Sequence, residues 1–274
     1  MRKIAVCGKG GSGKSMFVAL MGKALEELGY KVLIVDSDES NPGLFRMLGF
    51  GQMPQPFIEF LGGKKSVQRS MIEKLTSGEQ ESGVKLPIPE KLSSREIPGE
   101  YFISRGNLRL LSIGKIREPL EGCACPMGAV SREFLGRIEL EDDEIILVDM
   151  EAGVEHFGRG VEANIDVLLA LVEPSFESLE VACKAISLAW DIGVRETFAV
   201  LNKIPSEEAE AKLKEELKRR GVEFLGTVHY DPVVFEACLE GKPLGRCKAS
   251  EEVRGIVHRL VKILDLPIHP QAGE

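Results

Sequence analysis

Short apolar runs alternate with longer amphipathic stretches along most of this chain. Six runs have the length and composition of buried strands, at residues 4–7, 31–36, 144–149, 167–172, 198–201 and 225–228. Three stretches have a helical pattern of apolar residues, at residues 16–28, 178–190 and 252–264. A fourth helix is predicted at 206–220, where Glu and Lys at i,i+4 spacing indicate a solvated face. The alternation predicts an α/β fold with a doubly wound, mostly parallel sheet flanked by helices.

Two further apolar runs, 101–104 and 108–113, flank Arg105-Gly106-Asn107 and predict a β-hairpin. The region from about 62 to 100 is rich in Gly, Ser, Lys and Pro, so we expect irregular structure there with one short helix near Met71. The 274 residues suffice for one large domain, and the Gly- and Pro-rich breaks are too short to separate two. We therefore expect a single domain over residues 1–274 with an insertion at about 62–100.

The sequence GKGGSGKS at residues 8–15 lies between the first predicted strand and the first predicted helix. Gly8, Gly13, Lys14 and Ser15 satisfy the pattern G-x-x-x-x-G-K-[ST] in the context that a phosphate-binding loop requires. Lys14 is expected to reach the β- and γ-phosphates of ATP or ADP, and Ser15 to bind Mg²⁺. Further nucleotide contacts are expected from Gly10, Gly11, Ser12 and Met16. These features predict a P-loop NTPase.

Two predicted strands end in an acidic residue. Asp36-Ser37-Asp38 follows the run at 31–36, and Asp149 closes the run at 144–149. Carboxylates at this edge of a parallel sheet can hold Mg²⁺ or polarise an attacking water, although the first pair could also serve as turn or N-cap acids. We expect Asp149 to hold Mg²⁺ through a water molecule, and Gly153 to let the backbone approach a γ-phosphate.

Asn202 and Lys203 follow the predicted strand at 198–201. An amide both donates and accepts hydrogen bonds, which suits the edge of a purine base. The residues after Asn202-Lys203 are Ile204 and Pro205, so the guanine-specific pattern N-K-x-D is absent and adenine is favoured.

Among the six cysteines, Cys123 and Cys125 are close in sequence. A Cys-x-Cys pair cannot comfortably form a disulfide, but it can aim two thiolates at one soft metal ion such as Zn²⁺ or Ni²⁺. Two more ligands are needed, and a second copy of the pair across a two-fold axis would supply them in a homodimer. Two loop cysteines without a ligand are the alternative.

The other cysteines receive different interpretations. Cys183 and Cys238 lie in helical apolar patterns and are expected in the core, and Cys7 is expected in a strand. Neither Cys247 nor His156 is assigned a role.

Charge and hydropathy limit the partners. The net charge of −8 argues against broad binding to nucleic acid or anionic membranes. Apolar runs of membrane-spanning length and a signal peptide are both absent from the sequence, so we expect a cytoplasmic protein.

Lys9 adds a second lysine to the loop and gives the pattern K-G-G-x-G-K-S. This resembles the deviant P-loop ATPases of the MinD, nitrogenase iron protein and CooC group. The resemblance implies that Lys9 crosses a dimer interface to the partner's phosphates, and that Asp38 activates the attacking water. From the residues alone, Lys9 could equally be a solvated loop cation.

Two longer stretches sharpen the resemblance. CACPMG at 123–128 and DMEAGVEHFGRG at 149–160 are similar to CooC-type ATPases, which mature nickel enzymes. This similarity implies an ATPase that binds nickel at a dimer interface and delivers it to a client such as carbon monoxide dehydrogenase or acetyl-CoA synthase. Two alternatives stay open, namely an ATP-driven electron carrier with an interface iron-sulfur cluster and a MinD-like positioning switch.

Overall fold

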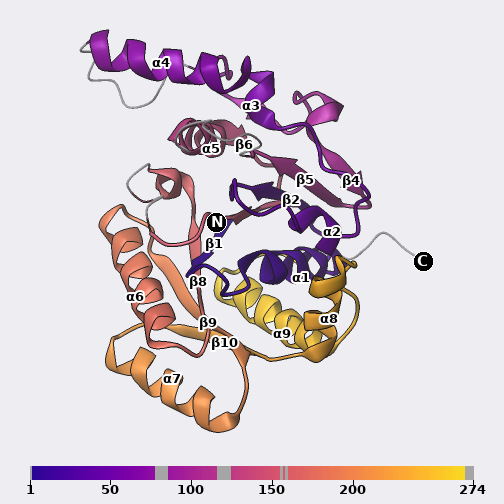
Figure 1. Ribbon diagram of the computed structural model, residues 1–274, viewed down its shortest axis with the longest axis vertical. Helices are drawn as coiled ribbons and strands as arrows, with labels where there is room; N and C mark the ends of the chain where they lie inside the picture. Colours follow the sequence, from indigo (N-terminus) through magenta and orange to yellow (C-terminus); the bar gives the residue numbers. More distant parts are fainter. Residues whose placement is uncertain (1, 78–85, 116–124, 155–156, 158–159, 269–274) are drawn as a thin grey trace.

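The computed structural model of the chain describes residues 2–77, 86–115, 125–154, 157 and 160–268 (Figure 1). The strands of its main sheet are β1 (Lys3–Gly8), β2 (Lys31–Asp36), β4 (Ile103–Arg105), β5 (Leu108–Ser112), β7 (Glu144–Asp149), β8 (Val167–Val172), β9 (Glu196–Ile204) and β10 (Phe224–His229). Within the described part, these eight strands are ordered β10-β9-β8-β1-β7-β2-β5-β4. All neighbours are parallel except β4 and β5, which are antiparallel and confirm the predicted hairpin. The doubly wound, mostly parallel sheet is thus confirmed.

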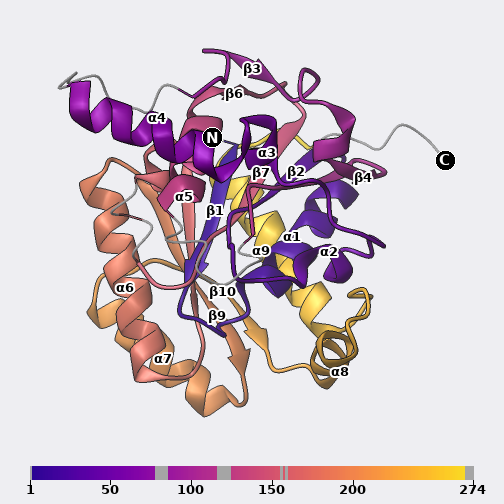
Figure 2. The ribbon, with the colours of Figure 1, turned by 45° about the horizontal axis from the view of Figure 1, so that its top comes forward.

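Helices cover both faces of the sheet (Figure 2). The α-helices of the described residues are α1 (Lys14–Glu27), α2 (Leu44–Met47), α3 (Phe57–Phe60), α4 (Gly63–Ser77), α5 (Cys125–Arg137), α6 (Phe176–Asp191), α7 (Glu207–Arg219), α8 (Pro232–Glu240) and α9 (Lys248–Ile263). A short pair of parallel strands, β3 (Leu92–Ser93) and β6 (Ile138–Glu139), forms a second sheet.

Each strand of the central sheet feeds two apolar cores because successive side chains point to opposite faces. In β1, Ile4 and Val6 pack in the core formed with α1 and α9, whereas Ala5 and Cys7 pack in the core formed with α5 and α6. The central strands are therefore buried on both sides, which is why they appear in the sequence as continuous apolar runs.

Helix α4 corrects the expectation of a short helix near Met71. It spans 15 residues, and its Val67 is buried in the same core as α5. The Gly, Ser and Lys content of this segment suggested irregular structure, yet contacts with the neighbouring α3 and α5 order a helix against the domain.

In the part of the chain that the structure covers, every helix is too short or too polar to cross a membrane.

The strand register places the two acidic strand ends side by side. Asp36 of β2 and Asp149 of β7 are Cα partners across the sheet, and Val6 of β1 is the partner of Asp149 on the other side. The phosphate-binding loop leaves β1 at this same edge. Parallel pairing therefore gathers the P-loop and both acids at the carboxyl ends of three adjacent strands.

Phe134 of α5 tests the core beneath this edge. Its side chain is fully buried, and its ring meets that of Phe57 edge to face at 5.1 Å between centroids. We expect Phe134→Ala to lower the free energy of unfolding by about 3–5 kcal/mol, because it deletes a ring and leaves a cavity. Denaturant unfolding measures this. The matched control is Phe176→Ala, at a position that is 68% exposed, where the loss should stay within about 0.5 kcal/mol. Equal losses in the two variants would contradict the packing described.

Candidate nucleotide and metal site

The P-loop joins β1 directly to α1. Gly11 and Gly13 have φ values of 83° and 93°, in the left-handed region that favours glycine. A Cβ atom at Gly13 would also lie 2.5 Å from the amide nitrogen of Asn202. Because α1 begins at Lys14, the free N–H groups of its first turn face this loop. The loop and the first turn of α1 therefore form a site that can bind an anion such as a phosphate group.

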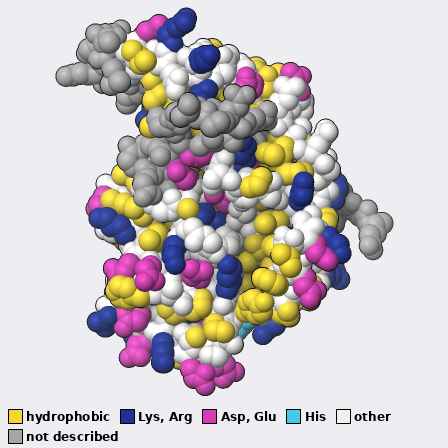
Figure 3. Space-filling model, in the orientation of Figure 1, with side chains coloured by type: hydrophobic (Ala, Val, Ile, Leu, Met, Phe, Trp, Pro, Cys, Tyr) yellow, Lys and Arg dark blue, Asp and Glu magenta, His cyan; other side chains and the backbone are white. Residues whose placement is uncertain are grey.

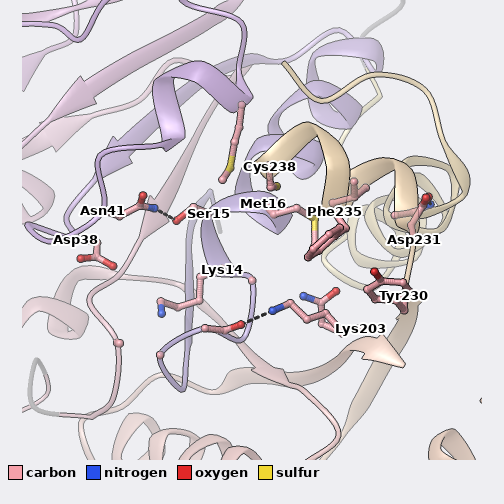
Figure 4. A pocket seen from close by; sticks show the side chains of 18 of the residues that line it. Lys14, Ser15, Met16, Asp38, Asn41, Lys203, Tyr230, Asp231, Phe235 and Cys238 are labelled. Carbon is pink, nitrogen blue, oxygen red and sulfur yellow. Dashed lines mark hydrogen bonds between the residues drawn. The ribbon is translucent and has the colours of Figure 1, made fainter. Parts of the chain in front are cut away.

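A cavity of about 580 Å³ opens beside the loop, a size typical of small-molecule sites (Figure 4). At one end lie the polar side chains of Lys14, Ser15, Asp38 and Asn41. At the other end lie the large, mostly apolar side chains of Met16, Tyr230 and Phe235. The cavity can thus take a phosphate chain at one end and an aromatic base at the other.

Asp36 and Asp149 are an acidic pair behind Ser15, which lines the cavity and contacts Asp149. Both are buried, and in each carboxylate Oδ1 has no hydrogen-bond partner among the described residues. Burial, together with the charge of Asp36, raises the pKa of Asp149 to about 7. The other oxygen of Asp149 accepts a hydrogen bond of 2.5 Å from the hydroxyl of Ser15.

These residues fit Mg²⁺, which prefers carboxylate, hydroxyl and water oxygens. Two buried carboxylate oxygens without partners are costly unless a cation or proton compensates them. Ser15 and Asp149 would hold Mg²⁺ here, as the sequence predicts, with Asp36 next to them.

Asp38 lies on the loop that follows β2 and lines the cavity. Its carboxylate accepts hydrogen bonds from the backbone N–H and the hydroxyl of Ser40, at 2.9 and 2.6 Å. Asn41, on the same loop, donates its amide to Ser15. The loop thus brings a carboxylate to the polar end of the cavity, and its role in activating water stays a prediction.

Lys115 is a component of the site that sequence reasoning missed. Its side chain is 8% exposed, and its ammonium lies 2.7 Å from a carboxylate oxygen of Asp36. It also donates to the backbone carbonyls of Asp38 and Asn41. The available signal was a lysine placed three residues after a buried strand, at the edge of the sheet where ligands bind.

Lys9 and Gly153 lie beside this cavity and are engaged within the chain. The ammonium of Lys9 forms an ion pair of 3.2 Å with Glu173, just after β8. The N–H of Gly153 donates to the carbonyl of Gly8 at 3.2 Å. Both contacts must break before Lys9 can reach a partner chain or Gly153 a γ-phosphate.

Asn202 and Lys203 lie behind the P-loop in β9. The amide nitrogen of Asn202 donates to the carbonyl of Ser12 at 2.7 Å, and its buried Oδ1 has no partner among the described residues. The ammonium of Lys203 donates to the carbonyl of Gly11 at 2.5 Å (Figure 4). Both residues line the cavity. They brace the loop here, and contact with adenine stays a prediction.

The structure describes one member of the cysteine pair. Cys125 is the first residue of α5 and is partly buried, whereas Cys123 and the unassigned His156 lie outside the described residues. In the described residues, no group of three or more His, Cys, Asp or Glu side chains is arranged to hold a metal ion. Helix α5 is nevertheless joined to the nucleotide site, because the hydroxyl of Ser131 lies 2.9 Å from that of Ser37.

Helix α8 corrects the interpretation of Cys238. The helix has no buried residue, and Cys238 is exposed and lines the cavity rather than the core. Cys183 is only partly buried. Hydrophobic side chains gather over α8 in Figure 3, where Val233, Phe235 and Leu239 are each more than half exposed. Helical periodicity indicated an apolar face but not whether anything covers it. Cys247 precedes α9 at its N-cap.

Cys7 is buried in β1, as predicted, and its thiol should be unreactive toward alkylating reagents. Burial raises the pKa of its thiol to about 12, so almost no reactive thiolate forms at pH 8. We expect a thiol-alkylating reagent at pH 8 to leave Cys7 unmodified in the native chain and to modify it after denaturation, as read by peptide mass spectrometry. The exposed Cys238 serves as the labelled control. Labelling of Cys7 as fast as Cys238 in native protein would contradict this placement.

Several known proteins are similar to this chain in sequence or in fold. An uncharacterized ATP-binding protein of Methanocaldococcus jannaschii is 36% identical over 260 residues, which cover 95% of this chain and 100% of that protein. The carbon monoxide dehydrogenase accessory protein CooC of Rhodospirillum rubrum is 28% identical over 264 residues, which cover 94% of this chain and 97% of that protein. The structure of the MinD cell division protein of Aquifex aeolicus aligns with a TM-score of 0.66 at 20% identity, covering 96% of this chain and 97% of that one.

The family model described as the CobQ/CobB/MinD/ParA nucleotide binding domain matches residues 3–244. This match spans the P-loop, both acidic strand ends and the apolar end of the cavity. The sheet order and the site geometry agree with it, and the chain belongs to the CobQ/CobB/MinD/ParA family of nucleotide-binding P-loop proteins.

Proposed function

We propose that this chain is an ATP-hydrolysing metallochaperone that binds Ni²⁺ through Cys123 and Cys125 at a homodimer interface. Its client would be a nickel enzyme such as carbon monoxide dehydrogenase or acetyl-CoA synthase, and Zn²⁺ could occupy the same thiolates. One observation carries the proposal. The loop that follows β2 lies at the polar end of the cavity and contacts α5 through Ser37 and Ser131. Helix α5 begins at Cys125.

The nucleotide half of the proposal follows from the cavity. Lys14 and the N–H groups of the loop bind the phosphates, while Ser15 and Asp149 hold Mg²⁺, which would neutralise charge on the β- and γ-phosphates. Asp38 accepts a hydrogen bond from water and aims it at the γ-phosphorus. The apolar end encloses the adenine.

The proposed metal site needs a second copy of the chain. Two Cys-x-Cys pairs facing each other across a two-fold axis supply the four thiolates that a closed site for a soft ion needs. Lys9 would leave Glu173 and bind the phosphates of the partner, so that nucleotide and metal both favour the dimer. The affinities for ATP and for Ni²⁺ are then linked reciprocally. The 28% identity to CooC over nearly the whole chain supports this choice of metal and client.

A double variant tests the metal site. We expect Cys123→Ala with Cys125→Ala to abolish Ni²⁺ binding and Ni²⁺-dependent dimerisation, while ATP still binds, because the nucleotide cavity is untouched. Equilibrium dialysis with metal analysis and size-exclusion chromatography measure these. The matched control is Cys183→Ala with Cys238→Ala, which also removes two thiols and should keep one Ni²⁺ per dimer. Parent-like Ni²⁺ binding by the first variant would overturn the proposal. Iron with acid-labile sulfide in anaerobically purified parent protein would favour the iron-sulfur alternative.

Lys9→Ala tests the role of this lysine across the interface. We expect kcat for ATP hydrolysis to fall about 10²–10³-fold, because a cation that stabilises transition-state charge is lost, with little change in ATP affinity of the monomer. The control is Lys65→Ala on an exposed position of α4. A Lys9 variant that hydrolyses ATP and dimerises like the parent would show that Lys9 is only a solvated loop cation.

A further inference from the structure

Residues 113–115 lie between the nucleotide site and α5. On one side, the N–H of Ile113 donates to the carbonyl of Asp36 at 3.0 Å. On the other, Gly114 packs so closely on α5 that a Cβ atom there would lie 2.8 Å from the sulfur of Met127. Because residues 113–115 contact both the end of β2 and α5 this closely, a shift of either element displaces them as well.

Lys115 adds polar contacts to this connection between the nucleotide site and α5. Its three ammonium protons have three acceptors, the carboxylate of Asp36 and the carbonyls of Asp38 and Asn41. The two carbonyls are three residues apart on the loop that carries Asp38, so one side chain fixes both ends of the turn. Buried in this way, the lysine cannot exchange its partners for water without moving the loop.

The charges around Lys115 explain why a cation is needed there. The carboxylates of Asp36, Asp38 and Asp149 are buried and so close together that the charges of Asp36 and Asp38 raise the pKa of Asp149. The buried Lys14 is a second cation close to this group. Lys115 approaches the loop from the side of β5, whereas Lys14 lies on the cavity side. Binding of a divalent cation and a nucleotide changes the charge on the cavity side only. The loop therefore lies between the fixed charge of Lys115 and a charge that varies with the bound ligands.

The loop also has a second attachment to α5. Ser37 contacts Ser131, whose side chain is fully buried two turns into the helix that begins at Cys125. Hydrogen bonds and close packing therefore run without a break from Asp149, through the loop after β2 and residues 113–115, to α5. The N–H of Ser37 completes this path by donating to the carbonyl of Asp149 at 2.9 Å.

We infer that Lys115 is the positioning residue that holds the Asp38 loop for hydrolysis and transmits the state of the nucleotide site to α5. This inference rests on the proposed function and names its regulation: Lys115 makes Ni²⁺ affinity depend on the bound nucleotide. It touches neither phosphate nor metal and acts through Asp38 and α5.

The test compares Lys115→Met with the parent in ATP affinity, kcat and the ratio of Ni²⁺ affinities with and without Mg-ATP. We expect ATP affinity to change less than about threefold, while kcat falls about 10²-fold because Asp38 is no longer held in place. The ratio of Ni²⁺ affinities should fall to about one, although both ligands still bind. Lys31→Met is the matched control, since Lys31 also pairs with carboxylates, those of Glu141 and Asp143, but at the start of β2, the end of the strand opposite the site.

Lys115→Arg decides the matter if the Met variant does not fold. Arginine keeps the charge, but its planar guanidinium cannot satisfy the same three acceptors, so kcat and the affinity ratio should both fall about tenfold. A kcat and ratio within twofold of the parent in a folded Lys115 variant would overturn the inference and leave the proposed function intact. A parent chain that neither hydrolyses ATP nor binds Ni²⁺ would overturn both.

Discussion

The structure depends on a concentration of negative charge at one edge of a parallel sheet. Register alone makes Asp36 and Asp149 neighbours, and burial denies them the water that would otherwise solvate them. Lys115 compensates part of this charge from within the fold, and Ser15 contacts one carboxylate from the P-loop. A proton or a cation from solvent must compensate the rest. The site can thus hold a metal ion beside the nucleotide.

In this structure Lys9, Gly153 and Asn202 all contact groups of their own chain. Their contacts with Glu173, Gly8 and Ser12 use the groups that the family resemblance assigns to a partner chain, a γ-phosphate and a base. The ion pair of Lys9 with Glu173 is partly exposed, and such pairs contribute only about 0–1 kcal/mol, so nucleotide binding can exchange it at small cost. The hydrogen bond of Asn202 is buried, so breaking it costs more unless the nucleotide provides a replacement partner.

The sheet and the P-loop were predictable because their signals are local. A buried parallel strand is a continuous apolar run, and GKGGSGKS sits between strand and helix. Lys115 was missed because its partners lie 74 to 79 positions away and only the sheet order brings them together. The length of α4 and the exposure of Cys238 were missed for a related reason: periodicity shows an apolar face, but the neighbours that cover it, or leave it bare, are set by tertiary packing.

The most direct measurement of the central claim is the thermal unfolding midpoint with saturating ADP, in excess Mg²⁺ and in excess EDTA. A ligand that binds only the folded chain stabilises it by RT ln(1 + [L]/Kd), so the midpoint rises with ligand concentration and with affinity. The buried carboxylates predict that ADP raises the midpoint clearly more with Mg²⁺ than with EDTA. Equal shifts in the two conditions would contradict the claim that this acidic edge binds metal and nucleotide together.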